Sequence, residues 1–280
     1  MSIKTFYHHY LILVLILITA NTYCQNLESE NDTTTQVPFF TQDFLSGYRA
    51  GVKLVSAPFS FDEEDWLITG SVMTAITIAY LLDKDDRSFW QKNHSTTLDR
   101  TADVGKFYGE ITNAALISGS LYLGGKIIGN KNIGVTSRIL LEGLFFTGLT
   151  TTLIKTIAGR SRPYAEEGYN RFKLFQTETA HTSFPSGHVT VAFTLSTILS
   201  SIINNDYATI GLYALAASTV MQRLYSDNHW LSDTVLSASI GYFIGKAVVK
   251  FDDNSNENDL CVNAYYIPTG VGVSFLYSLH

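Results

Sequence analysis

Three short polar stretches of this 280-residue chain each adjoin a long apolar run, and together they hold side chains suited to binding an anion. The stretches read KTIAGRSRP, PSGH and RLYSDNHWLSD. Lysine and arginine form charge-assisted hydrogen bonds with phosphate-like anions, and histidine exchanges protons near neutral pH. The side chains concerned are Lys155 and Arg162 in the first stretch, Ser186, Gly187 and His188 in the second, and Arg223, His229 and Asp233 in the third.

The PSGH stretch predicts an anion site at the start of a helix, because it directly precedes a charge-free run. Ser186 and Gly187 fall where the first backbone N–H groups of that helix have no partner and the helix dipole is positive. Glycine lets the backbone approach an anion closely, and His188 would present its imidazole there. The alternative is an ordinary capped helix whose His188 points into solvent.

The other two stretches also fall at expected helix ends. Lys155 and Arg162 lie seven residues apart where an apolar run stops, and Asp233 follows His229 by four residues. On a helix that spacing brings the carboxylate beside the ring, where it can orient the imidazole and set its tautomer. Basic residues that complement a helix dipole and a merely local His–Asp pair are the alternatives. Three such coincidences at helix ends favour one shared site.

Taken together, the three stretches resemble the signature of the type 2 phosphatidic acid phosphatase and vanadium haloperoxidase superfamily, which reads K-x6-RP, PSGH and SR-x5-H-x3-D. The spacing matches throughout, and the one departure is Gln222, where the family usually has serine. That departure bears on the surroundings of Arg223 and leaves the catalytic positions intact. The resemblance covers about 136–249, and the order of helices extends it back to about Trp66.

The resemblance implies a role for each residue. His229 would be the nucleophile that forms a phosphohistidine, Asp233 would orient it, and His188 would protonate the leaving oxygen and then activate water. No cofactor or metal is expected, because three fixed cations would neutralise the phosphate charge. The implied phosphate-binding residues are Lys155, Arg162, Ser186, Gly187 and Arg223.

Three functional classes are compatible with these residues. The preferred one is a metal-independent phosphatase acting on a phosphomonoester or diphosphate, carried by a lipid. The others are a vanadate-dependent haloperoxidase, for which the chain is short, and a non-catalytic envelope scaffold. The partner would be a phosphorylated lipid or a small phosphate ester. The candidate pocket walls are four aromatic residues of the loop 164–184, Tyr164, Tyr169, Phe172 and Phe175, and the alternative is a surface loop packed on its own aromatics. A net charge of −6 without blocks of like charge disfavours nucleic acid.

The elements that would position these residues are helices. Hydrophobic residues make up 46% of the chain and charged residues 16%, against roughly 25% charged in an average soluble protein. The fold class predicted is all-α, a bundle of about six helices of the phosphatidic acid phosphatase type 2 kind, connected by 83–106, 130–132 and 164–184. The six runs of helix length are Trp66–Leu82, Ile111–Gly125, Gly143–Ile154, Val189–Asn205, Tyr207–Gln222 and Leu231–Val249.

Four regions follow from these patterns. Residues 1–24 read as a signal peptide, 25–60 as a polar leader and entry segment, and 61–252 as a helical phosphatase domain. In the C-terminal tail, 253–280, apolar residues alternate on both sides of a Pro-Thr-Gly turn, as in a β-hairpin. The alternative for the tail is an extension packed on the helical body.

The signal peptide places the protein in a bacterial cell envelope. Five charge-free stretches of 12 to 17 residues fall short of the roughly 20 apolar residues that a membrane span requires. The sequence therefore favours a periplasmic protein, soluble or resting on a membrane, with its site facing the periplasm. An integral membrane protein is the alternative.

Overall fold

The computed structural model describes residues 39–253, 260–267 and 270–277. The chain divides into two compact units, Ser46–Asp253 and a second one formed by Met1–Leu45 with Asn254–His280. The predicted signal peptide and most of the polar leader lie outside the described residues.

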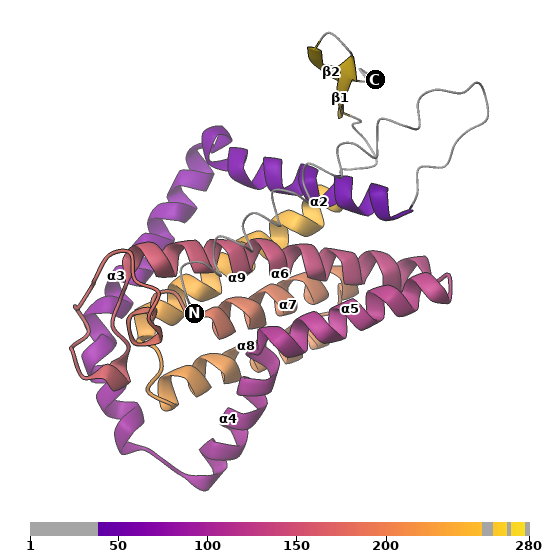
Figure 1. The fold of residues 1–280 in the computed structure, drawn as a ribbon. Coiled ribbons are helices and arrows are strands. Elements are labelled where there is room, and N and C mark those ends of the chain that lie inside the picture. The colour runs from indigo at the N-terminus through magenta and orange to yellow at the C-terminus, as the bar shows by residue number, and fades with distance from the viewer. Residues whose placement is uncertain (1–38, 254–259, 268–269, 278–280) are drawn as a thin grey trace. The chain divides into compact units, whose positions relative to one another are not determined.

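The larger unit is built from α-helices, which confirms the all-α prediction for it. Its central helix is α7, which packs against α6, α8 and α9, while α5 lies along α6 (Figure 1). The helices are α2 (Phe39–Ser56, which begins in the other unit), α3 (Glu63–Lys92), α4 (Thr96–Gly109), α5 (Ile111–Ile127), α6 (Lys131–Ala158), α7 (Gly187–Ile203), α8 (Asp206–Tyr225) and α9 (Leu231–Asp253). Short 3-10 turns occupy Ala57–Ser60, Pro163–Ala165 and Thr179–His181.

The core forms where α6, α7 and α9 meet. Helix α7 is buried although it carries several hydroxyls, because these bond within the helix: Thr190 donates to the Ser186 carbonyl and Thr194 to the Thr190 carbonyl, at 2.9 and 2.8 Å. A side chain on Gly241 of α9 would lie 2.6 Å from the Thr190 carbonyl, so this glycine permits the close approach of α9. The buried core residues are Ala114, Ile139, Leu140, Leu144, Val191, Leu195, Ile198 and Val248.

All six predicted helices are present, and α2 and α4 are additional. The expected connection 83–106 is wrong, because α3 continues to Lys92 and α4 begins at Thr96. Charge-free runs identify the apolar part of a helix but not its polar continuation. Ser95 begins α4 as an N-cap, since its side chain accepts a hydrogen bond from the backbone N–H of Leu98.

Within the described residues, three helices are long and apolar enough to cross a membrane: α3, α6 and residues Leu231–Asp252 of α9. The prediction that five charge-free stretches fall short of a span is therefore wrong for the two that lie in α3 and α6, since each of these helices extends beyond its charge-free run. Only 6% of the most apolar window of α3 is buried within the protein, and Leu67, Met73 and Leu81 are among its exposed side chains. Such an apolar outer surface indicates association with a membrane.

In the smaller unit, β1 (Leu260–Ile267) and β2 (Gly270–Tyr277) pair antiparallel. The register places Leu260 opposite Tyr277 and Ile267 opposite Gly270. The structure thus pairs the two alternating segments of the tail as a hairpin.

Candidate active site

Helix ends bring the three polar stretches together. Lys155 is in the last turn of α6, and the left-handed Gly159, with φ 58°, ends that helix. A side-chain carbon added to Gly187, the first residue of α7, would lie 3.9 Å from Cε of Lys155. Arg223 is in the last turn of α8, whose final carbonyls accept the backbone N–H of His229 at 3.3 Å. The site therefore lies where two helices end and two begin.

The predicted His–Asp pair is present, although its local geometry differs from the one expected. Helix α9 begins at Leu231, so His229 precedes the helix and does not share it with Asp233. Its Nδ1 lies 3.5 Å from Oδ2 of Asp233 because the chain folds back over the first turn of α9. The same carboxylate oxygen accepts hydrogen bonds from the backbone N–H of Trp230, at 2.9 Å, and from the Ser183 hydroxyl. With Nδ1 facing Asp233, Nε2 of His229 points away from the carboxylate.

A buried arginine inside the first stretch supports Asp233. Arg160 is fully buried, and its guanidinium pairs with Asp233 at 2.5 Å and with Asp83 of α3 at 2.6 Å. Asp83 also accepts hydrogen bonds from the backbone N–H and the hydroxyl of Ser232, at 2.9 and 2.8 Å. The ring of Phe184 lies 6.0 Å from the same guanidinium. The network Asp83–Arg160–Asp233 thus ties α3 to the carboxylate that faces His229.

Sequence reasoning missed this network. Arg160 lies within the K-x6-RP stretch, and Asp83 is the first charge after the apolar run of α3, but no spacing links them. The weak signals that could have found them are a charge directly at the end of an apolar run and an arginine between two residues already assigned to the site.

The three predicted cations are held by neutral groups. Lys155 Nζ donates to the Thr182 carbonyl at 2.7 Å, Arg162 Nη1 donates to the side-chain oxygen of Asn228 at 3.2 Å, and Arg223 Nε donates to Gln222. Within the described residues, none of the three forms an ion pair with a carboxylate. Their positive charge is therefore available for an anion. The departure at Gln222 is also explained, because its amide oxygen holds Arg223.

Three buried side-chain atoms of the described residues have no hydrogen-bond partner in the protein: Nε of Arg162, Oγ of Ser186 and Nδ1 of His229. All three belong to residues predicted for the site. An unpaired buried polar group costs about 1–3 kcal/mol. Ser186 does not use its hydroxyl to cap α7, and its backbone N–H donates to Ser237 at 2.6 Å. The Ser186 hydroxyl and Arg162 Nε are thus ready to bond a ligand, beside the unpaired N–H groups of the first turn of α7.

Burial and nearby cations control protonation in the site. Burial lowers the pKa of His229 to about 3, against the opposing effect of Asp233, and the charges of Lys155 and Arg162 lower it further. Burial, and then the charge of Arg162, lower the pKa of Arg223 to about 10. At neutral pH, His229 is therefore an uncharged imidazole with a lone pair, as a nucleophile requires.

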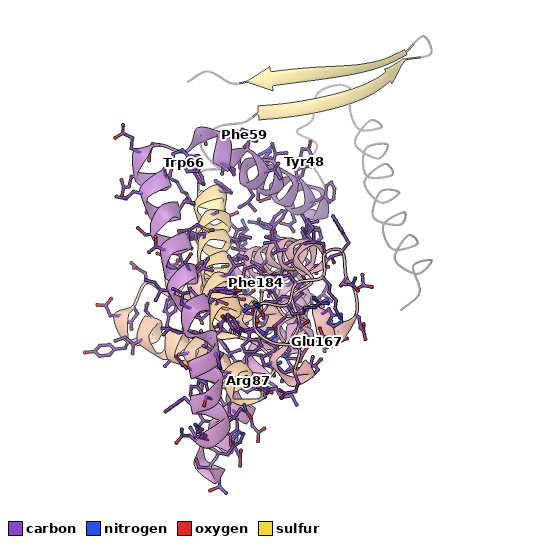
Figure 2. The ribbon with its side chains drawn as sticks, turned by 90° about the vertical axis from the view of Figure 1, so that its left-hand side faces the viewer. Tyr48, Phe59, Trp66, Arg87, Glu167 and Phe184 are labelled. Atoms are coloured by element: carbon purple, nitrogen blue, oxygen red, sulfur yellow. The ribbon has the colours of Figure 1, made fainter. Side chains whose placement is uncertain are left out.

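Arg87 of α3 forms salt bridges with two loops of the site, the one between α6 and α7 and the one between α8 and α9. Arg87 donates two hydrogen bonds of 2.8 Å to Asp227 and two, of 2.6 and 3.3 Å, to Glu166. Asp227 and Glu166 have φ values of 55° and 56°, in the left-handed region that costs energy for residues other than glycine. Figure 2 shows Arg87 toward the C-terminal end of α3, well away from Trp66 near its beginning. The end of α3 thus helps to hold both loops in place.

The aromatic residues of the loop 164–184 divide into two groups. Tyr169 packs on Tyr80 and Phe172 lies over Arg160, with separations of 5.4 and 5.3 Å, so both support the buried network. Tyr164 is exposed and lies 6.0 Å from the Arg162 guanidinium. Of the four expected wall residues, Tyr164 is the one placed beside a predicted phosphate ligand, while Phe175 is exposed.

Residues 137–257 match the model of the PAP2 superfamily, and all three predicted motifs lie within that range. This part of the chain is similar to the PAP2 superfamily and is called the PAP2 domain from here on. The resemblance inferred from the motifs is thereby confirmed.

Relatives of the PAP2 domain include two proteins of Porphyromonas gingivalis. The chain is 30% identical over 80 residues to its Lipid A 1-phosphatase, which covers 28% of this chain and 18% of that protein. It is 23% identical over 118 residues to its Lipid A 4'-phosphatase, covering 41% and 50%. The chain thus spans half or less of the length of each relative.

The fold of the PAP2 domain also has a solved counterpart. The crystal structure of the first transmembrane PAP2 type phosphatidylglycerolphosphate phosphatase from Bacillus subtilis aligns with a TM-score of 0.52 at 16% identity. The alignment covers 66% of this chain and 95% of that one. At this identity, the likeness concerns the fold alone.

Proposed function

We propose that the PAP2 domain is a phosphatase that hydrolyses a phosphomonoester or diphosphate of a lipid through a phosphohistidine intermediate. The observation that carries the proposal is the arrangement of Lys155, Arg162 and Arg223, three buried or half-buried cations that are bonded only to neutral groups. The charges of Lys155 and Arg162 act on the uncharged His229 ring, and the Ser186 hydroxyl has no partner in the protein. Phosphoryl transfer requires this combination of an in-line nucleophile and dense positive charge.

In the first step, the Nε2 lone pair of His229 attacks phosphorus and the bond to the leaving oxygen breaks. His188 gives its proton to that oxygen, so an alcohol leaves and a phosphohistidine remains. Asp233 stabilises the positive charge that develops on the His229 ring, and Arg160 and Ser183 keep that carboxylate in place. The three cations, the Ser186 hydroxyl and the first N–H groups of α7 would bind the equatorial oxygens.

In the second step, His188 takes a proton from water while the water oxygen attacks phosphorus. The P–N bond breaks, its electron pair returns to His229, and inorganic phosphate is released. Fixed cations supply the charge neutralisation, so the proposed reaction needs no metal ion. Chelation with EDTA should then leave turnover unchanged, whereas activity that disappears in EDTA and returns with a divalent metal would contradict this part of the proposal.

The proposed substrate is a phosphorylated lipid, and a lipid A phosphate is the first candidate. Two observations support it: the names of the two relatives, and the exposed apolar surface of α3. Along α3, the exposed apolar surface ends next to the site: Leu82 is exposed, and the next residue, Asp83, belongs to the buried network. A lipid whose chains lie along the helices would present its phosphate at this level.

We further propose that α3, α6 and α9 cross the membrane with the site at the periplasmic face. Glu63 and Asp83 are twenty residues apart on α3, which at 1.5 Å per residue is about 30 Å, the thickness of the hydrocarbon core. Asp233 and Asp252 are nineteen residues apart on α9, or about 28 Å. Charged residues therefore lie at both ends of segments of membrane thickness, and the segment on α9 also contains Lys246 and Lys250. Because α3 runs toward the site, a periplasmic site places Glu63 on the cytoplasmic side. This topology requires that residues 1–24 are not a cleaved signal peptide, since cleavage would leave the chain from residue 25 in the periplasm.

The decisive experiment measures phosphate release by the detergent-purified chain from lipid A phosphates, phosphatidic acid, an isoprenoid diphosphate and p-nitrophenyl phosphate. Turnover of a lipid substrate, lost in His229→Ala and kept in His94→Ala, supports the proposal. His94 is the matched control, because it is an exposed histidine outside the site. A phosphorylated protein trapped from labelled substrate should be acid-labile and base-stable. A folded His229→Ala enzyme that keeps more than about a tenth of wild-type activity would exclude His229 as the nucleophile.

A further inference from the structure

A carboxylate that no motif includes lies against the second histidine of the site. Oε2 of Glu110 is 3.0 Å from Nε2 of His188, and the two residues are 78 positions apart. Glu110 is the single residue between α4 and α5. Sequence analysis expected neither α4 nor any role for this residue.

Glycines fix the position of this junction. A side-chain carbon on Gly105 would lie 2.3 Å from the Ser218 carbonyl, so α4 packs directly on the backbone of α8. The Gly105 carbonyl accepts a hydrogen bond of 2.8 Å from the Thr219 hydroxyl. At Gly109 the added carbon would lie 2.8 Å from the carbonyl of His188 itself. The backbone just before Glu110 is therefore held against the residue that its side chain contacts.

We propose that Glu110 is a positioning residue for His188, holding Nε2 so that Nδ1 faces the oxygen that leaves and the water that enters. The inference rests on the proposed phosphatase function. The arrangement mirrors the other histidine, where Asp233 faces Nδ1 of His229 and leaves Nε2 for phosphorus. In this proposal, each imidazole of the site has one ring nitrogen facing a carboxylate and uses the other nitrogen for the reaction.

The charges around His188 explain why a carboxylate is needed. Arg223 on α8 and Lys155 on α6 face the ring as cations, and Glu110 faces it as an anion. Burial first, and then Arg223, lower the pKa of His188 to about 4, while Glu110 opposes this effect. General acid catalysis needs a protonated ring: Nε2–H would donate to Glu110 while Nδ1–H is given to the leaving oxygen. Binding of an anionic phosphate to the cations works in the same direction as Glu110.

The test compares Glu110→Gln and Glu110→Asp with wild type over a pH series, on a lipid phosphate and on p-nitrophenyl phosphate. We expect Glu110→Gln to lose about 10- to 100-fold in kcat on the lipid, no more than the lower end of the roughly 100- to 10,000-fold that a general acid itself contributes. The loss on p-nitrophenyl phosphate, whose oxygen leaves without a proton, should be less than about 3-fold. KM should change little, the alkaline limb of kcat should move to lower pH, and Glu110→Asp should recover part of the loss. Asp103→Asn, which removes a charge from an exposed position of α4, should match wild type.

A double variant separates positioning from folding. If Glu110 acts through His188, adding Glu110→Gln to His188→Ala should cost less than about 2-fold more. Losses that multiply, or an equal loss on both substrates with an unchanged pH profile, would overturn the inference while leaving the phosphatase itself established. If Glu110→Gln does not fold, the same criteria apply to Glu110→Asp. A wild-type protein that releases no phosphate from any ester would overturn the proposed function and this inference together.

Discussion

The carboxylate of Asp83 and the guanidinium of Arg160 form an ion pair of 2.6 Å in which neither side chain is exposed. Asp83 is on α3, and Arg160 follows α6, with Asp233 on the far side of the same guanidinium. One arginine therefore connects the longest helix of the bundle to the residue that orients the proposed nucleophile. The same guanidinium donates hydrogen bonds to the Tyr169 carbonyl at 3.0 and 2.7 Å. Arg160 thus connects its own segment with α3, with α9 and with the loop that contains Tyr169.

Asp83→Asn should lower both stability and turnover. Breaking a buried ion pair by removing one charge costs about 3–5 kcal/mol, because the partner charge stays buried. We expect a lower thermal midpoint in detergent and a reduced kcat with little change in KM, since Asp83 supports Asp233 and lies outside the proposed phosphate ligands. Glu166→Gln is the control, because solvent screens the ion pair of that exposed partner of Arg87 and its loss should change stability little. Equal midpoints for the two variants would contradict the role assigned to Asp83.

Arg162→Lys should weaken anion binding although the charge is kept. The guanidinium grips two oxygens at once, whereas an ammonium is a point charge, and Nε of Arg162 is one of the unpartnered buried atoms. Vanadate should inhibit wild type competitively, and we expect its inhibition constant to rise at least about 10-fold in the variant, or about 1.4 kcal/mol. Arg171→Lys, on an exposed part of the loop, provides the matched control. An unchanged inhibition constant would remove Arg162 from the phosphate ligands.

The pKa of His229 gives stability a pH dependence with a definite sign. Its folded-state pKa of about 3 lies below the ordinary histidine value, so below about pH 6.5 the unfolded chain binds a proton that the folded chain does not. The contribution of His229 to the free energy of unfolding is therefore fully present above about pH 6.5. It falls by about 1.4 kcal/mol per pH unit as the pH decreases toward 3. His229→Gln should flatten thermal midpoints measured between pH 6.5 and 4. Identical slopes for wild type and variant would show that His229 is not buried in its neutral form.

The residues proposed for catalysis and phosphate binding could be predicted from the sequence, whereas the residues that support them could not. Lys155, His188 and His229 each lie in a short stretch whose residue spacing is characteristic, so the local pattern identifies them. Glu110 and Asp83 reach the site from 78 and 77 residues away, and neither makes a motif with its partner. Their role depends on how helices pack, which periodicity does not specify.

The helices also divide into parts that the local sequence pattern predicts and parts that depend on packing against distant residues. The apolar run Trp66–Leu82 identified α3 but not its polar end, where Asp83 and Arg87 form ion pairs with residues of distant loops. Helix α4 has few apolar residues, and glycines dictate its packing on α8, so a search for apolar runs overlooks it. Elements that bury one apolar face are thus predictable, and those held by close backbone contact are not.

The membrane placement makes the last prediction. If α3, α6 and α9 cross the bilayer, carbonate washing should leave the protein in the membrane fraction, because apolar side chains such as Leu67, Met73 and Ile78 would otherwise face water. A reporter fused after Ser183, in the loop before α7, should be active in the periplasm. A cysteine introduced at Glu63, about 30 Å along α3 from Asp83, should react only with reagents that reach the cytoplasm. Release by carbonate would show that the helices do not span, and a reporter active only in the cytoplasm would place the site on the opposite face.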